Sequence, residues 1–245
     1  MLILGGGSDI AAAFARRCIT AGLDTLVLAG RAGGSVDVVA TSMLRDHPDV
    51  KVEVVGFDGA DTARHRAALI AIDEQHGPFD TVVVAFGVLG EPFTVDTDPA
   101  KAAELATINF SSAVSSCLAS LQILRGEPNA RLVVLSSITA VRPRIGNIIY
   151  GSAKAGVDAF ATELRAPARD IGVDVVIVRP GFVHSRMTEG LDPAPFAATT
   201  EQVADDMFNG LTNGRAVIHS PAILSPVGRV LRLLPAPIWR RVSAQ

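Results

Sequence analysis

The sequence has few of the residues that mark disulfide-rich and metal-binding proteins. It contains two cysteines in 245 residues, and Cys18 and Cys117 stand singly, with no CxxC and no histidine cluster nearby. A disulfide framework is therefore not expected, and a chain of this length can bury a core without one. The five histidines show no metal-ligand spacing, so no metal site is predicted.

Long apolar runs and a surplus of basic residues are missing as well. No run of eighteen apolar residues occurs, which predicts that no helix spans a membrane. The net charge of −3 leaves no broad basic face for nucleic acid, so nucleic acid is not an expected partner. Met1 leads directly into the first expected strand, so we expect no targeting leader and a cytoplasmic location.

Two residue types that are rare in this chain stand four positions apart. Tyr150 is the single tyrosine, and Lys154 is one of three lysines. Positions i and i+4 share one face of a helix, so the two side chains would project together. Ser137 lies upstream at the end of an expected strand, where parallel sheets place their chemistry. We interpret Ser137, Tyr150 and Lys154 as catalytic, although a bare YxxxK spacing more often marks an ordinary helix start.

Apolar and amphipathic segments alternate along the chain, which predicts one domain over residues 1–245. The expected strands are 1–5, 24–29, 50–57, 80–86, 131–137, 173–179 and 214–219. The expected helices are 9–21, 35–47, 61–76, 99–125, 151–171 and 200–212. This alternation is typical of an α/β fold with a parallel sheet covered on both faces. Right-handed crossovers make it a doubly wound, Rossmann-type sheet of about seven strands.

The first expected strand is followed by a glycine-rich turn, Gly5-Gly6-Gly7-Ser8-Asp9-Ile10. Glycines let a backbone approach a pyrophosphate, which then lies on the amides of a helix N-terminus. We predict that this turn binds a dinucleotide, the alternative being an ordinary glycine-rich turn. The Asp9 carboxylate would repel a pyrophosphate, so we expect it to point away, with helix capping as one role.

The ends of the next strands would border the rest of the cofactor. Gly30 offers no carboxylate for a ribose 2′-hydroxyl and Arg31 suits a 2′-phosphate, which favours NADP(H). Stacking on adenine or simple solvation of Arg31 is the alternative. Asp58 could accept a hydrogen bond from the adenine amino group or cap its own loop. The backbone of Ala85-Phe86-Gly87 would border the adenosine ribose.

The segment after the sixth expected strand would lie at the nicotinamide end. Pro180-Gly181-Phe182-Val183-His184-Ser185 turns across the end of the sheet, and Ser185 could bind the nicotinamide carboxamide. His184 is interpreted as a loop histidine rather than a base. Residues 185–200 lack periodicity and contain two prolines, which predicts a substrate lid.

Four further polar residues are candidates for the site. Asn109, between apolar neighbours, needs a buried partner. We interpret it as support beneath Tyr150 and Lys154, with ordinary helix packing as the alternative. Arg142, Arg144 and Arg186 flank the expected mouth, where they could bind a substrate phosphate or remain solvated.

The end of the chain has an unusual composition. Residues 226–245 carry four arginines and no acid, so the remaining residues have a net charge of −7. Six apolar residues, Trp239 among them, interleave with the arginines. Such a segment is typical of a membrane interface. Packing on the domain or on a second subunit is the alternative.

With Ser137, Tyr150 and Lys154 in place, the chain resembles the short-chain dehydrogenases/reductases along nearly its whole length. The resemblance implies an NAD(P)-dependent oxidoreductase acting on an alcohol or ketone. We also expect a homo-oligomer, in which the helices 99–125 and 151–171 could pair between subunits. It equates Asn109 with the family's helix asparagine, Asp58 with its adenine contact, and Ser185 with its nicotinamide-loop threonine. The family turn Thr-Gly-x-x-x-Gly-x-Gly keeps only its first glycine here, and Asn-Asn-Ala-Gly appears as Val84-Ala85-Phe86-Gly87.

A narrower resemblance is to the reductase components of decaprenylphosphoryl-ribose 2′-epimerase. It is carried by residues 84–90, 150–156 and 179–187 and by the basic, Trp-containing end. It implies a keto-pentose on a polyprenyl phosphate as substrate, NADH as cofactor, a flavin oxidase partner and a role in cell-wall arabinan synthesis. A reductase of an acyl or steroid-like ketone is one alternative, and a non-catalytic NAD(P)-binding protein is another.

Overall fold

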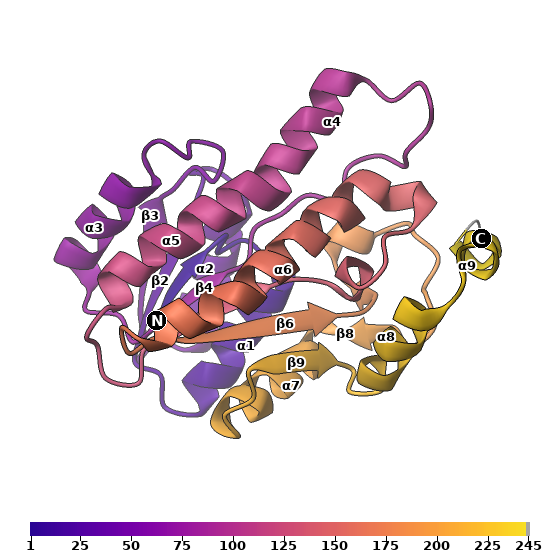
Figure 1. Ribbon diagram of the computed structural model, residues 1–245. Helices are drawn as coiled ribbons and strands as arrows, with labels where there is room; N and C mark the ends of the chain where they lie inside the picture. Colours follow the sequence, from indigo (N-terminus) through magenta and orange to yellow (C-terminus); the bar gives the residue numbers. More distant parts are fainter. Residues whose placement is uncertain (244–245) are drawn as a thin grey trace.

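The computed structural model describes residues 1–243, which fold around a seven-stranded parallel sheet (Figure 1). The strands are β1 (Leu2–Leu4), β2 (Thr25–Gly30), β3 (Lys51–Gly56), β4 (Thr81–Val84), β5 (Arg131–Leu135), β6 (Asp174–Pro180) and β9 (Val217–Ser220). Their order is β3-β2-β1-β4-β5-β6-β9, so the winding direction reverses between β1 and β4. The predicted doubly wound sheet is confirmed, and ligands bind such sheets beside the reversal.

Helices cover both faces of the sheet (Figure 1). One face packs against α1 (Asp9–Thr20), α2 (Ser35–Asp46) and α7 (Thr200–Thr212). The other packs against α3 (His65–His76), α5 (Ser112–Leu124) and α6 (Ile148–Arg169). β1 lies inside the sheet, between β2 and β4, and all three of its residues are fully buried. Apolar strands without alternation are what a sheet covered on both faces requires.

A long helical stretch crosses one face and extends beyond it. It consists of α4 (Pro99–Ala106), a π-helical turn (Thr107–Ser111) and α5. By length and composition Pro99–Leu124 could cross a bilayer, but 56% of its most apolar window is buried inside the protein. Burial of this kind is also found in core helices of soluble proteins, so the stretch is weak evidence for a membrane span.

Short elements surround the end of the sheet where the predicted site lies. The pair β7 (Val183–His184) and β8 (Ala198–Thr199) joins the two ends of the predicted lid, residues 185–200. Two helices that the sequence did not delimit, α8 (Leu224–Leu233) and α9 (Ala236–Ser243), form the tail beside this end (Figure 1). The described tail packs on its own domain, which is one of the alternatives weighed for it.

Candidate functional site

The glycine-rich turn is shaped by contacts that exclude side chains. Gly5 has φ +87°, and a Cβ added there would lie 2.7 Å from the backbone nitrogen of Phe86. Only glycine adopts such a conformation without strain, so the turn after β1 can pass close to the end of β4. A Cβ on Gly7 would lie 1.9 Å from the Ser35 hydroxyl. The segment Gly5-Gly6-Gly7 therefore forms a tight turn even though it keeps only the first glycine of the family pattern.

The N-terminus of α1 offers donors to an anion. The Ser8 side chain caps the helix by accepting from the Ala11 amide at 3.4 Å, so Asp9 is not the capping residue. In residues 1–243 the amides of Asp9 and Ile10 have no hydrogen-bond acceptor. Free amides and the positive end of the helix dipole suit a phosphate group. This cradle, narrowed by glycine, fits the pyrophosphate of a dinucleotide cofactor.

The predicted catalytic residues meet between β5 and α6. Ser137 follows the end of β5, and Tyr150 and Lys154 lie on consecutive turns of α6. The Lys154 Nζ donates to the carbonyl of Leu135 at 2.9 Å and lies 5.9 Å from the centre of the Tyr150 ring. Ser137 and Lys154 are buried and Tyr150 is partly buried. The structure therefore brings these three residues together.

Burial changes the protonation of both titratable groups in this cluster. It raises the pKa of Tyr150 to about 12, against a smaller lowering by a hydrogen bond with Ser137. It lowers the pKa of Lys154 to about 8. A charged form loses hydration when it is buried, so both groups are shifted towards neutrality. The phenol is therefore protonated at neutral pH, as a proton donor must be.

Asn109 lies in the π-helical turn, an irregularity that often occurs at functional sites. Its amide donates to the carbonyls of Val88 at 2.7 Å and Leu105 at 3.0 Å, and its carbonyl accepts from the Val88 amide at 3.1 Å. A Cβ on Gly87 would meet both the Asn109 carbonyl and the Lys154 ammonium. Asn109 thus fixes the loop after β4 beside Lys154. The same hydrogen bonds agree with both interpretations of Asn109, ordinary helix packing and support of the residues around Lys154.

A buried charge network, which the sequence analysis missed, lies one turn beyond Lys154. Arg179 forms two hydrogen bonds of 2.8 Å to the carboxylate of Asp158, and the Ser136 hydroxyl donates to Asp158 at 2.8 Å. The only signal was spacing, because Tyr150, Lys154 and Asp158 follow one another at intervals of four on one helix face. Lys154 and Asp158 together fix α6 to the end of β5, which carries Ser137.

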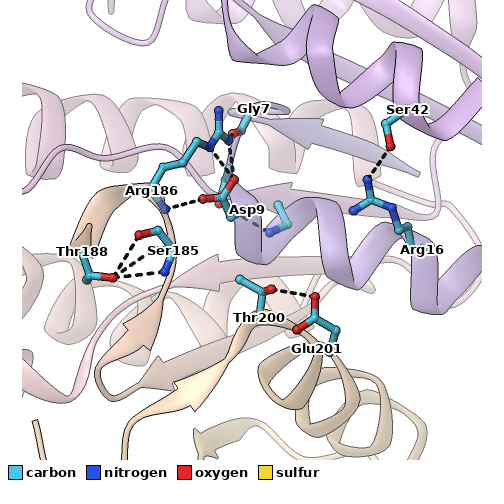
Figure 2. Close-up of polar contacts among 11 residues, drawn as sticks. Gly7, Asp9, Arg16, Ser42, Ser185, Arg186, Thr188, Thr200 and Glu201 are labelled. Carbon is cyan, nitrogen blue, oxygen red and sulfur yellow. Dashed lines mark hydrogen bonds and ion pairs between the residues drawn. The ribbon is translucent and has the colours of Figure 1, made fainter. Parts of the chain in front are cut away.

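The segment that was predicted to lie at the nicotinamide end contacts the glycine-rich turn, as Figure 2 shows. The Asp9 carboxylate accepts from the backbone amide of Arg186 at 2.8 Å and from its Nε at 2.7 Å. The guanidinium also donates to the carbonyl of Gly7. The Asp9 carboxylate is directed towards Arg186, and its pointing away from a pyrophosphate stays a prediction. Neither role considered for Arg186, a substrate-phosphate ligand or a solvated residue, describes this pairing.

Pro180 and Gly181 place the next segment across the end of the sheet. The Gly181 amide donates to the carbonyl of Ser220 at 2.9 Å. Val183 is buried in β7. The Ser185 amide donates to the Thr188 hydroxyl at 3.1 Å, so the backbone at Ser185 is held in a compact turn. These contacts bring the segment to the same end of the sheet as Tyr150 and Lys154.

The remaining predicted contacts are dispersed around this end. Arg31 is exposed at the tip of β2. The Asp58 carboxylate accepts from the Ala60 amide at 3.0 Å, which is the loop-capping alternative. Arg142 is not a free phosphate ligand, because it donates to the carbonyls of Leu231 and Leu234 in the tail. Ala85 and Phe86 follow β4 beside Gly5.

Comparison with known proteins gives consistent relatives. Residues 1–195 match the family described as short chain dehydrogenase. An uncharacterized oxidoreductase of Mycobacterium tuberculosis is 39% identical over 99% of this chain and 96% of its own length. Another from Streptomyces coelicolor is 36% identical over 99% and 95%.

Solved structures with a similar fold include two short-chain dehydrogenases. The one from Sphingobium yanoikuyae, in complex with NADPH, has a TM-score of 0.79 and 22% identity over 90% of this chain and 87% of its own. The one from Burkholderia phymatum, in complex with NAD, has a TM-score of 0.78 and 19% identity over 93% and 91%. At these identities the structural likeness concerns the fold.

Proposed function

The chain belongs to the short-chain dehydrogenase family, and on that premise we propose that it is an NAD(P)H-dependent reductase of a ketone. The observation that carries this proposal is the cluster of Ser137, Tyr150 and Lys154, which lies beside the loop after β4 that the glycine-rich turn also contacts. A protein that only binds a nucleotide does not need a buried phenol and a buried ammonium on adjacent helical turns. Such a protein is the second candidate, and no observation favours it.

The proposed roles follow from the protonation states. Tyr150, protonated at neutral pH, donates its proton to the ketone oxygen. Ser137 holds that oxygen by a hydrogen bond and stabilises the charge that develops on it. The Lys154 ammonium stabilises the phenolate left after the transfer. Asn109 positions the loop beside Lys154 and anchors a water that returns the proton. When bound, the dihydronicotinamide supplies the hydride.

The proposed cofactor contacts use the groups at the carboxyl ends of the strands. The turn at Gly5 and the amides near Ser8, Asp9 and Ile10 hold the pyrophosphate. Arg31 binds the 2′-phosphate of NADP(H) where that cofactor is used. The remaining proposed contacts are Asp58, Ala85, Phe86, Gly87, Pro180, Gly181, Val183 and Ser185.

The direct test is oxidation of NADH and of NADPH with a panel of ketones, monitored at the absorbance of the reduced nicotinamide. The panel includes a prenylphosphoryl keto-pentose, a long acyl ketone and a steroid ketone. Turnover with any of them supports the reductase. Tight dinucleotide binding with no turnover across the panel favours the non-catalytic alternative.

The pH dependence of kcat/KM is a second expected result. Lys154 has a pKa of about 8, so its ammonium is present below pH 8 and is lost as the pH rises through it. We expect kcat/KM for ketone reduction to fall about tenfold per pH unit above 8, because kcat/KM for the ketone reports the protonation of the enzyme before the ketone binds. Lys154→Met should have a low kcat/KM that does not fall above pH 8. A wild-type profile that stays level to pH 10 would contradict the role of Lys154.

For the substrate we propose a lipophilic ketone, and specifically the keto-pentose of a polyprenyl phosphate in arabinan precursor synthesis. The resemblance to the epimerase reductases supports it, and so does the apolar border of the site. Exposed apolar side chains lie on the lid and at the start of α6: Met187, Leu191 and Phe196 on the lid, and Ile145 and Ile148 just before and at the first residue of α6. Arg144, which is exposed, is the proposed phosphate contact. A flavin oxidase would supply the ketone by oxidising the ribosyl alcohol.

For the tail we propose peripheral contact with the cytoplasmic face of the plasma membrane. Val230 and Leu233 are 58% and 84% exposed on α8, next to the exposed Arg229 and Arg232. The side chains of 240–243 lie outside the described part of the chain. Apolar side chains beside arginines suit an anionic bilayer.

The expected result is flotation of the protein with phosphatidylglycerol vesicles. Changing Val230 and Leu233 together to serine should reduce the bound fraction severalfold, because apolar insertion is lost. The matched control is Leu118→Ser, since Leu118 is 47% exposed on α5, away from the tail. Equal flotation of all three proteins would end the membrane proposal. In that case we propose that the exposed apolar residues serve assembly into a homo-oligomer, with 99–125 and 151–171 at the interface.

A further inference from the structure

The ion pair of Asp9 with Arg186 connects two walls of the proposed cofactor groove. Asp9 begins α1 directly after the glycine-rich turn, and Arg186 lies 177 residues later, next to Ser185. Figure 2 shows the guanidinium reaching across to both Asp9 and the Gly7 carbonyl. The contact therefore joins the segment proposed for the pyrophosphate to the segment proposed for the nicotinamide.

Arg186 makes this contact with three of its nitrogen atoms. The Arg186 amide and Nε bind different oxygens of Asp9, at 2.8 Å and 2.7 Å, and a second guanidinium nitrogen binds Gly7. Two parallel charge-assisted bonds hold orientation as well as distance. The pairing also neutralises Asp9, which would otherwise repel a pyrophosphate on the neighbouring amides. The third guanidinium nitrogen, Nη1, has no acceptor in the described part of the chain.

The segment that carries Arg186 is itself well ordered by internal bonds. The Thr188 hydroxyl accepts from the Ser185 amide at 3.1 Å and donates to the Val183 carbonyl. The Arg186 side chain is nevertheless 52% exposed, against 25% for Asp9. A compact turn that is fixed at its base and tied across the groove by an exposed contact can open without unfolding the sheet.

We propose that Asp9 and Arg186 form a clasp that closes over the pyrophosphate of the bound dinucleotide and sets the rate of its release. The proposal rests on the proposed function, because it needs a dinucleotide in the groove. In the closed state the clasp covers the anion, and Nη1 of Arg186 is available to it. Release then requires the two residues to separate. Both are positioning residues for the cofactor, not catalytic residues.

The test measures dissociation of NADPH from the full-length protein by stopped-flow fluorescence. Asp9→Asn and Arg186→Gln should each speed release at least about fivefold, since each removes a charge-assisted contact. The double variant should be no faster than the faster single one, because both changes break the same contact. Asp205→Asn is the matched control, because it removes the exposed Arg17–Asp205 pair of 3.0 Å, which joins α1 to α7. It should leave release unchanged.

Asp9→Asn is the variant that decides. If Asp9 merely competed with the pyrophosphate, its loss would slow release, and slower or unchanged release would overturn the clasp. 2′-Phospho-ADP-ribose, which keeps the pyrophosphate and the 2′-phosphate of NADPH but has no nicotinamide, should show the same fold-change in affinity. If only NADPH were affected, the contact would act on the nicotinamide, and the assignment to the pyrophosphate would be wrong. A wild-type protein that binds no dinucleotide would refute both the clasp and the proposed function.

Discussion

Tyr150→Phe should remove nearly all ketone reduction and leave dinucleotide binding intact. The change deletes one oxygen from a partly buried ring, so the shape of the site is preserved. General-acid catalysis contributes about 10²–10⁴-fold, and kcat should fall by that factor. The burial that raises the pKa of Tyr150 to about 12 keeps the phenol protonated at neutral pH, ready to donate. Single-turnover rates measure the loss of ketone reduction, and titration of the same variant with the cofactor measures dinucleotide binding.

The matched control for this variant is Phe160→Leu. Phe160 is a partly buried ring on the same helix, packed against the core that includes α6. Its truncation should cost stability and leave kcat within about threefold, because no reacting group is touched. A Tyr150→Phe protein that retained more than about a tenth of the wild-type kcat would remove Tyr150 from the role of acid.

Asp158→Ala should lower the free energy of unfolding by about 3–5 kcal/mol, because it removes one partner of a largely buried ion pair. It leaves the guanidinium of Arg179, whose side chain is only 15% exposed, without its two charge-assisted bonds. It also frees the Ser136 hydroxyl, which donates to the same carboxylate. Urea unfolding followed by circular dichroism measures the loss.

Two comparisons separate the charge effect from simple truncation. Asp205→Ala, which removes an exposed pair, should cost less than about 1 kcal/mol. Replacing both partners, with Asp158→Leu and Arg179→Met, should recover much of the loss because no charge is left buried alone. If Asp158→Ala cost no more than Asp205→Ala, the network would have no special weight in fixing α6 to β5.

The order of strands and helices was predictable because each buried segment is apolar and each covering helix is amphipathic. The seven expected strands are all present, and the reversal between β1 and β4 follows from right-handed crossovers. Ser137, Tyr150 and Lys154 could also be placed together. A strand end and a helix face fix their positions before any side-chain contact is known.

Contacts between distant segments could not be predicted in the same way. No local sequence pattern predicts that Arg186 will pair with Asp9. None predicts that Arg142 will donate to carbonyls at the end of α8. Asp158 was missed because a single carboxylate on an amphipathic helix is ordinarily exposed. Its burial depends on Arg179, which arrives from a different strand. Pairings of this kind are decided by the assembled fold.

The parallel pairing of β7 with β8 has a consequence for how relatives of this protein can diverge. It fastens residues 183–184 to 198–199, so the loop between them leaves and rejoins the body at one place. Such a loop can be lengthened, shortened or grafted from a relative with little strain on the strands beneath. The acid and its neighbours on α6 would be unaffected by the exchange. Chimeras that exchange only residues 189–197, and keep Ser185, Arg186 and Thr188, are therefore a practical way to change the substrate of the protein.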